Sequence, residues 1–201
     1  MEPNPRGGDF LPNNFVQLTL LAFEDVTGAN AVKAVLNLGG LTRLVGNFPP
    51  PDSEKKFPYR EFTRILSGFE DLYGPRGGRA LCHRAGEQTF LAGAKIFGVD
   101  SGEHPASLSA GMERVAWYLN SALTADACME KKRGSLRFSI GHCPTCTERW
   151  SAVPVCQFFT GFLREAARWS GNGKPVFVTE TSCIAGGDEA CVFEIFPHPP
   201  K

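Results

Sequence analysis

The chain has 201 residues, of which 42% are hydrophobic and 16 are Phe, so it can bury the core of one compact domain without disulfide staples. Lys and Arg total 21, and Asp and Glu also total 21, a balance that gives no electrostatic footprint for nucleic acid or an anionic membrane. No apolar run approaches the ~20 residues that span a bilayer and no signal peptide opens the chain, so we expect a cytoplasmic protein whose thiols are reduced.

Helices are predicted in the first half of the chain. Residues 1–9 hold two prolines and two glycines, which predicts a flexible leader before a single domain over residues 10–201. Apolar residues recur at helical spacing after Pro12 and stop at Gly28. The same signals predict helices over residues 12–27, 29–38, 59–72, 78–97 and 106–124. Gly74-Pro75 separates the third of these from the fourth.

Strands are predicted in the second half. Residues 128–132 and 136–140 form one hairpin, turned at Arg133-Gly134, and residues 176–180 and 191–195 form a second, turned at Gly186-Gly187-Asp188. A helix is predicted from Val153 to Trp169 between the hairpins, with Pro154 in its first turn. The order indicates an α+β fold, with a helical N-terminal half packed on a small antiparallel sheet.

The second hairpin carries ligands that suit a soft metal. Glu180 follows a run of valines, where an ionised carboxylate is costly unless a cation or hydrogen bonds compensate it. Cys183 and Cys191 flank the turn, and Cys156 lies on the apolar stripe of the preceding predicted helix. Three thiolates and one carboxylate suit tetrahedral zinc. Each cysteine alone is more typical of a small buried apolar residue.

A second candidate metal or redox site is formed by His142, Cys143 and Cys146. A Cys-x-x-Cys pair can bind zinc or cycle as a dithiol, and Cys-Pro beside a histidine can ligate haem iron. A thioredoxin-like pair would open a helix, whereas Thr147-Glu-Arg-Trp150 intervenes here. A loop with no chemical role, a contribution to the zinc cluster, and a redox or tetrapyrrole role all remain open.

The segment from Cys156 to Phe193 resembles the core signature of the 4-vinyl reductase domain family. The matching residues are Cys156-x-Phe158-x-x-Gly161-Phe162 and Val178-x-Glu180-x-x-Cys183-x-x-Gly186-x-x-x-x-Cys191-x-Phe193. The family is named after a proposed reduction of the vinyl group of a chlorophyll precursor. It includes archaeal proteins suspected of binding hydrocarbons, and sensory domains of bacterial activators that respond to aromatic compounds.

This resemblance implies a zinc ion held by Cys156, Glu180, Cys183 and Cys191. It also implies the dimeric α+β fold of transport-particle subunits. The family motif does not include Cys143 and Cys146.

The sequence favours binding over catalysis. It lacks a Ser-His-Asp pattern, a dinucleotide fingerprint and a flavin motif, so a reductase would need a partner to supply electrons. Aromatic residues on two helices are predicted to wall an apolar pocket, although this spacing is also typical of a core. They are Phe158, Phe159, Phe162, Trp169, Trp117 and Tyr118.

We therefore expect a zinc-stabilised homodimer that senses or carries an apolar, aromatic or tetrapyrrole-like ligand and passes its output to a protein partner. The alternative is an accessory protein or 4-vinyl reductase of tetrapyrrole metabolism.

Overall fold

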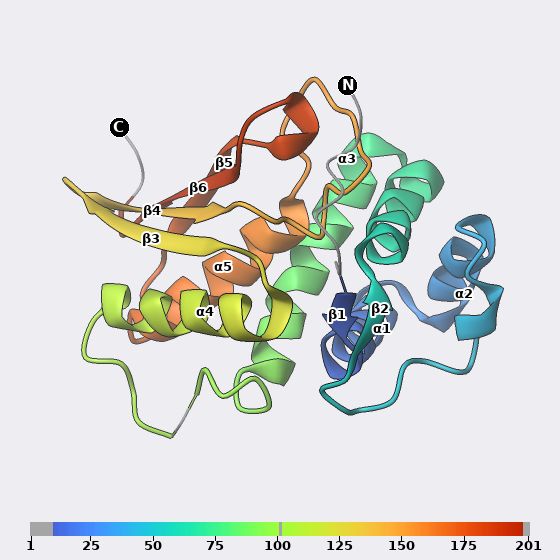
Figure 1. Cartoon of the computed structure of the whole chain (residues 1–201), viewed down its shortest axis with the longest axis horizontal. Coiled ribbons are helices and arrows are strands. Elements are labelled where there is room, and N and C mark those ends of the chain that lie inside the picture. The colour runs from blue at the N-terminus through green and yellow to red at the C-terminus, as the bar shows by residue number, and fades with distance from the viewer. Residues whose placement is uncertain (1–9, 101, 199–201) are drawn as a thin grey trace.

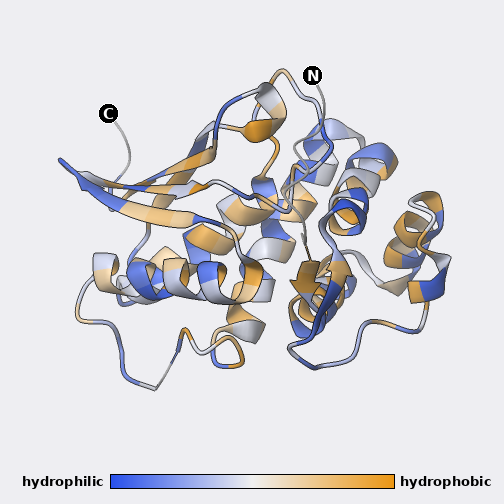
Figure 2. Cartoon of the chain, in the orientation of Figure 1, coloured by the Kyte–Doolittle hydropathy of each residue, from blue (hydrophilic) through white to orange (hydrophobic). Residues whose placement is uncertain are grey.

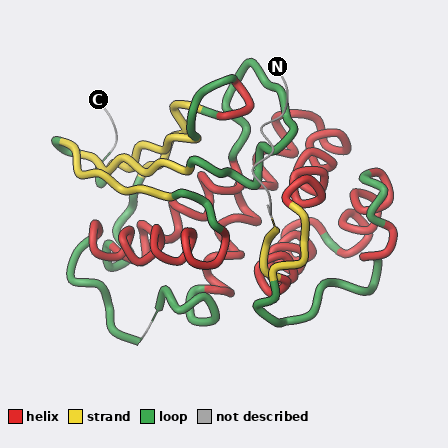
Figure 3. Tube along the Cα trace, viewed as in Figure 1, coloured by secondary structure: helices red, strands yellow, loops and turns green. Residues whose placement is uncertain are grey.

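The computed structural model describes residues 10–100 and 102–198, and the predicted leader lies outside them. Helices dominate the N-terminal half and strands the C-terminal half (Figure 3), which confirms the α+β prediction. The helical half holds α1 (Asn13–Thr27), α2 (Ala29–Leu38), α3 (Tyr59–Gly93) and α4 (Leu108–Leu123). Among the described residues, no helix is long and apolar enough to cross a bilayer.

Local signals set most helix boundaries where they were predicted. Gly74 has φ 75° and ψ 161°, so α3 consists of two helical segments that meet at Gly74-Pro75. The hydroxyl of Ser107 accepts the N–H of Ala110 at 3.1 Å and caps the start of α4. The predicted end of the fourth helix at Phe97 is wrong. The helix stops at Gly93, and the ring of Phe97 stacks on Tyr118 of α4 at 4.6 Å, which turns the chain toward α4.

The C-terminal sheet has the order β3-β4-β6-β5, and every pair of neighbours is antiparallel. Its strands are β3 (Ala127–Lys132), β4 (Ser135–Ile140), β5 (Phe177–Ser182) and β6 (Cys191–Phe196). Both predicted hairpins are present. A separate short pair, β1 (Phe10–Pro12) and β2 (Lys55–Pro58), lies beside α1.

Helix α5 (Gln157–Ser170) connects the two halves of the sheet in sequence and lies under it in space (Figure 1). It begins at Gln157, so the predicted start at Val153 is wrong. Cys156 is the residue before the helix, not a member of its apolar stripe. Its N–H donates to the carboxylate of Glu180 at 2.8 Å. This bond ties the start of α5 to strand β5, so tertiary pairing sets the helix boundary.

Helices α3 and α5 cross with their backbones in contact. A Cβ atom on Gly86 would lie 2.0 Å from the carbonyl oxygen of Phe158, and one on Gly161 would lie 1.9 Å from the carbonyl oxygen of His83. Hydrophobic and hydrophilic residues alternate around α4 and α5 (Figure 2), as expected of helices that bury one face. The crossing fixes the start of α5, and with it the position of Cys156.

Candidate metal centre

Five cysteines and one glutamate converge where the sheet meets the start of α5. All six side chains are buried. Cys156 precedes α5, Glu180 comes from β5, Cys183 follows β5 and Cys191 opens β6. The remaining two cysteines, Cys143 and Cys146, come from the loop after β4.

Strand register explains part of this convergence. Glu180 pairs with Phe193 across β5 and β6. Cys191 lies two residues before Phe193, so its side chain lies on the same face of the sheet as that of Glu180. Ile140 pairs with Cys191 across β4 and β6. The loop that carries Cys143 therefore begins beside Cys191.

The distances between sulfur atoms are those expected of ligands to one ion. The Sγ atom of Cys156 lies 3.5 Å from that of Cys143, 3.5 Å from that of Cys191 and 3.7 Å from that of Cys183. The Sγ of Cys191 lies 3.4 Å from that of Cys146 and 4.0 Å from that of Cys183. Tetrahedral zinc with Zn–S bonds of ~2.3 Å places its sulfur ligands about 3.8 Å apart. All five cysteines are free thiols.

Glu180 has one oxygen that the protein does not satisfy. Its Oε2 accepts the N–H of Cys156, whereas its Oε1 is buried and has no hydrogen-bond partner among the described residues. Burial, followed by the charge of Cys183, raises the pKa of Glu180 to about 9. A cation beside Oε1 would stabilise the ionised form. The orphaned oxygen and the thiols around it therefore fit a thiophilic metal.

The thiols perturb one another strongly. Hydrogen bonds from neighbouring thiols, that of Cys146 first, lower the pKa of Cys183, whereas burial raises the pKa of Cys156. Without a cation, negative charge in this buried cluster is confined to few of its members. A divalent ion would allow more of the thiols to ionise.

The donor atoms form two overlapping groups of four. One holds Cys156, Glu180, Cys183 and Cys191, and the ligand atoms within it all lie within 4.8 Å of one another. The structure therefore brings the predicted zinc ligands together. The other group holds Cys143, Cys146, Cys156 and Cys191 at the same mutual limit. Cys143 and Cys146 thus lie in the same cluster rather than at a separate second site, and His142 lies outside both groups.

Contacts around the cluster hold its loops in place, and the sequence analysis missed them. Thr63 of α3 donates to the carbonyl of Pro144 at 2.8 Å, and Arg149 pairs with Glu70 of α3 at 2.9 Å. These bonds join residues about eighty positions apart, so no spacing signal predicts them. Asp188 accepts the N–H of Cys183 at 2.7 Å, and its place in a Gly-Gly-Asp turn was the one local signal available.

Most of the predicted pocket aromatics form core instead. Phe158, Phe159 and Phe162 are at most 1% exposed. Phe158 packs edge-on against Phe62 at 5.5 Å between ring centroids, and Phe162 packs edge-on against Phe90 at 5.3 Å. Trp169 is partly buried and stacks on His104. The part of the pocket prediction that assigns these rings to an open cavity has no support in their packing.

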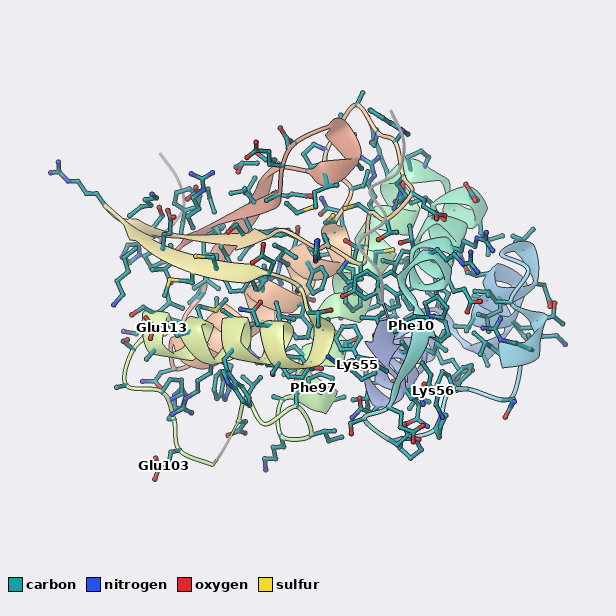
Figure 4. All side chains as sticks on the ribbon, in the orientation of Figure 1. Phe10, Lys55, Lys56, Phe97, Glu103 and Glu113 are labelled. Atoms are coloured by element: carbon teal, nitrogen blue, oxygen red, sulfur yellow. The ribbon has the colours of Figure 1, made fainter. Side chains whose placement is uncertain are left out.

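Trp117 and Tyr118 line a groove of about 280 Å³ between α4 and the β1–β2 pair. Trp117 is 63% exposed, whereas Tyr118 is buried and its hydroxyl has no hydrogen-bond partner among the described residues. Lys55 and Phe97 also line the groove and lie near each other in Figure 4. The groove thus combines aromatic walls, an unpaired hydroxyl and an ammonium group.

Comparisons with known proteins define the fold first. An H-NOX variant from T. tengcongensis is 14% identical and covers 94% of this chain and 99% of its own, with a TM-score of 0.63. An oxygen-binding H-NOX domain related to soluble guanylate cyclases is 12% identical and covers 94% and 96%, with a TM-score of 0.63. A third structure, described as concerning haem redox potential and porphyrin distortion, is 11% identical and covers 92% and 98%, with a TM-score of 0.62. At these identities the likeness shows an H-NOX-like fold alone.

The family comparison concerns the segment that holds most of the cluster. Residues 136–197 match the family model of the 4-vinyl reductase domain. This match runs from β4 to the residue after β6 and confirms, over that segment, the resemblance that the sequence motif indicated. No curated protein matches the sequence.

The core of this chain does not fit a haem. Phe15 lies 5.9 Å from Phe62 and 6.3 Å from Phe162, and Phe158 lies 6.1 Å from Phe15, measured between ring centroids. These contacting rings fill the space where α1, α3 and α5 meet, and a porphyrin would have to displace them.

Proposed function

We propose that this chain is a zinc-stabilised domain that binds an apolar or aromatic small molecule. The observation that carries the metal part is the buried quartet of Cys156, Glu180, Cys183 and Cys191, in which Oε1 of Glu180 lacks a partner among the described residues. The match to the 4-vinyl reductase domain covers all four residues.

The donor set favours a structural role for the metal. Three thiolates and one carboxylate complete a tetrahedral shell, which leaves no open position for a reacting water. The ligands come from the start of α5, from β5 and from both sides of the β5–β6 turn. The ion would therefore cross-link the helix to the sheet.

The groove at Trp117 and Tyr118 supports the ligand part. Its aromatic and apolar walls suit an apolar body, while the unpaired Tyr118 hydroxyl and the Lys55 ammonium suit an acceptor group on the ligand. Lys55 donates to the carbonyl of Ser121 at 3.0 Å, which holds its ammonium at the rim. An apolar molecule that carries a carbonyl, phenol or carboxylate group has the matching chemistry.

Elemental analysis tests the metal assignment. Protein purified without chelator should contain zinc in at least one equivalent per chain, and Cys183→Ser combined with Cys191→Ser should lower that content. Cys128→Ser is the control, because Cys128 is an exposed thiol outside the cluster. Less than about half an equivalent of metal, or zinc unaffected by the double substitution, would contradict the assignment.

A thermal-shift screen of phenols, fatty acids, porphyrins and bilins tests ligand binding. A ligand that binds only the folded state must raise the melting temperature as its concentration exceeds its Kd. Failure of all four classes on ligand-free protein would instead favour a structural or interaction module.

A further inference from the structure

The two groups of four share Cys156 and Cys191. Cys143 and Cys146 complete one group, and Glu180 and Cys183 complete the other. The two shared sulfur atoms lie 3.5 Å apart, close to the ~3.8 Å edge of a zinc–thiolate tetrahedron. The six donors therefore have the arrangement of two tetrahedra that share one edge.

A single ion would leave part of this donor set unused. An ion in the all-cysteine group leaves Glu180 with its orphaned Oε1, together with a buried Cys183. An ion in the other group leaves Cys143 and Cys146 buried at 3.5 Å and 3.4 Å from sulfur atoms that hold the metal. Only two ions give every donor of the cluster a metal partner.

We propose that the chain binds two zinc ions bridged by the thiolates of Cys156 and Cys191. Cys143 and Cys146 complete the shell of one ion, and Glu180 and Cys183 complete that of the other. This inference rests on the proposed function, because the second ion is the one proposed there. It assigns Cys143 and Cys146 a role that the 4-vinyl reductase signature does not contain.

The charge balance of such a centre is reasonable. Five thiolates and one carboxylate carry one negative charge each, so two divalent ions leave a small residual negative charge. The N–H of Ile184 donates to Cys191 Sγ at 3.4 Å, and the N–H of Cys156 donates to Glu180. These donors are placed to offset the residual charge. The protons displaced from the thiols and the carboxyl pass to solvent on binding.

The sulfur spacing argues against an iron–sulfur cluster. Inorganic sulfide separates the irons of such a cluster, so thiolates bound to different irons lie farther apart than ligands of one ion. Here Cys143 and Cys156 lie 3.5 Å apart, and Cys146 and Cys191 lie 3.4 Å apart.

Native mass spectrometry of the full chain, reconstituted with zinc and freed of excess metal, tests the proposal. The expected mass corresponds to two zinc ions per chain. Cys143→Ser combined with Cys146→Ser should leave one ion, and Cys183→Ser should also leave one. Cys156→Ser should leave fewer than one, because it removes a bridge, and Cys128→Ser should retain both ions. Circular dichroism of each variant checks that it is folded.

Substitution with ¹¹³Cd gives a readout on the unmodified chain. Two resonances with mutual coupling through the bridging sulfurs are expected. One zinc per chain that Cys143→Ser with Cys146→Ser does not alter would overturn the bridged centre and leave the proposed single site intact. A complete lack of metal, or iron with acid-labile sulfide, would overturn both.

Discussion

At the scale of single residues, Glu180 and Tyr118 each bury a polar atom that finds no hydrogen-bond partner among the described residues. Leaving such an atom unpaired costs ~1–3 kcal/mol. The two atoms lie at different places, Oε1 of Glu180 in the cysteine cluster and the hydroxyl of Tyr118 at the α4 groove. A metal at the first and a ligand at the second would remove these costs.

Tyr118→Phe separates the stability of the groove from its binding. The substitution deletes the unpaired hydroxyl and keeps the ring that stacks on Phe97. We expect the free energy of unfolding to stay equal or rise by ~1 kcal/mol, since a buried unpaired group is lost. Affinity for a ligand with an acceptor group should fall about tenfold, because one hydrogen bond disappears. Urea titration and a ligand titration measure the two effects, and unchanged affinity would place the ligand elsewhere.

At the scale of elements, the crossing of α3 and α5 depends on two glycines. Alanine normally stabilises a helix by ~1 kcal/mol relative to glycine. At Gly86 and Gly161, however, the added methyl group would meet a backbone carbonyl at 2.0 Å and 1.9 Å. A backbone group cannot swing aside as a flexible side chain can, so the helices would have to separate.

Gly161→Ala should therefore destabilise the chain by about 3 kcal/mol despite its better helix propensity. Moving α5 would also displace Cys156, so zinc affinity should fall. The matched control is Gly77→Ala, an exposed position in α3 where the nearest atom outside the helix backbone is Cβ of Tyr73 at 3.3 Å. We expect that change to stay within ~1 kcal/mol of the parent. Denaturant unfolding of both variants decides, and equal stability of the two would contradict the close crossing.

At the scale of the whole molecule, the metal cluster joins the loop after β4, the start of α5 and the β5–β6 hairpin. Removing zinc with a chelator should lower the stability of the fold on the order of several kcal/mol, because binding energy at a structural site is folding energy. Scanning calorimetry before chelation, after it, and after zinc is restored measures the change. A melting temperature that does not move after verified metal loss would show that the cluster does not stabilise the fold.

A homodimer remains a prediction from the family resemblance. Sedimentation equilibrium over a range of concentrations should give twice the 21.9 kDa chain mass. A monomer at every concentration tested would contradict it.

The sequence determined the local elements of this protein. Glycine and proline placed the breaks at Gly28 and Gly74-Pro75, and period-2 patterns placed both hairpins. The spacing of Cys156, Glu180, Cys183 and Cys191 also identified a quartet whose ligand atoms the structure brings together. These signals are readable because each depends on backbone preferences or a known motif within a short stretch of chain.

Only the tertiary structure decided how distant segments meet. The pairing of Ile140 with Cys191 and the bond from Thr63 to Pro144 bring Cys143 and Cys146 into the cluster. The bond from Cys156 to Glu180 accompanies the start of α5 at Gln157, and packing sends Phe158 into the core while Trp117 stays at a groove. Such outcomes depend on strand register and helix crossing, which are set by the summed contacts of the whole molecule rather than by any one stretch of sequence.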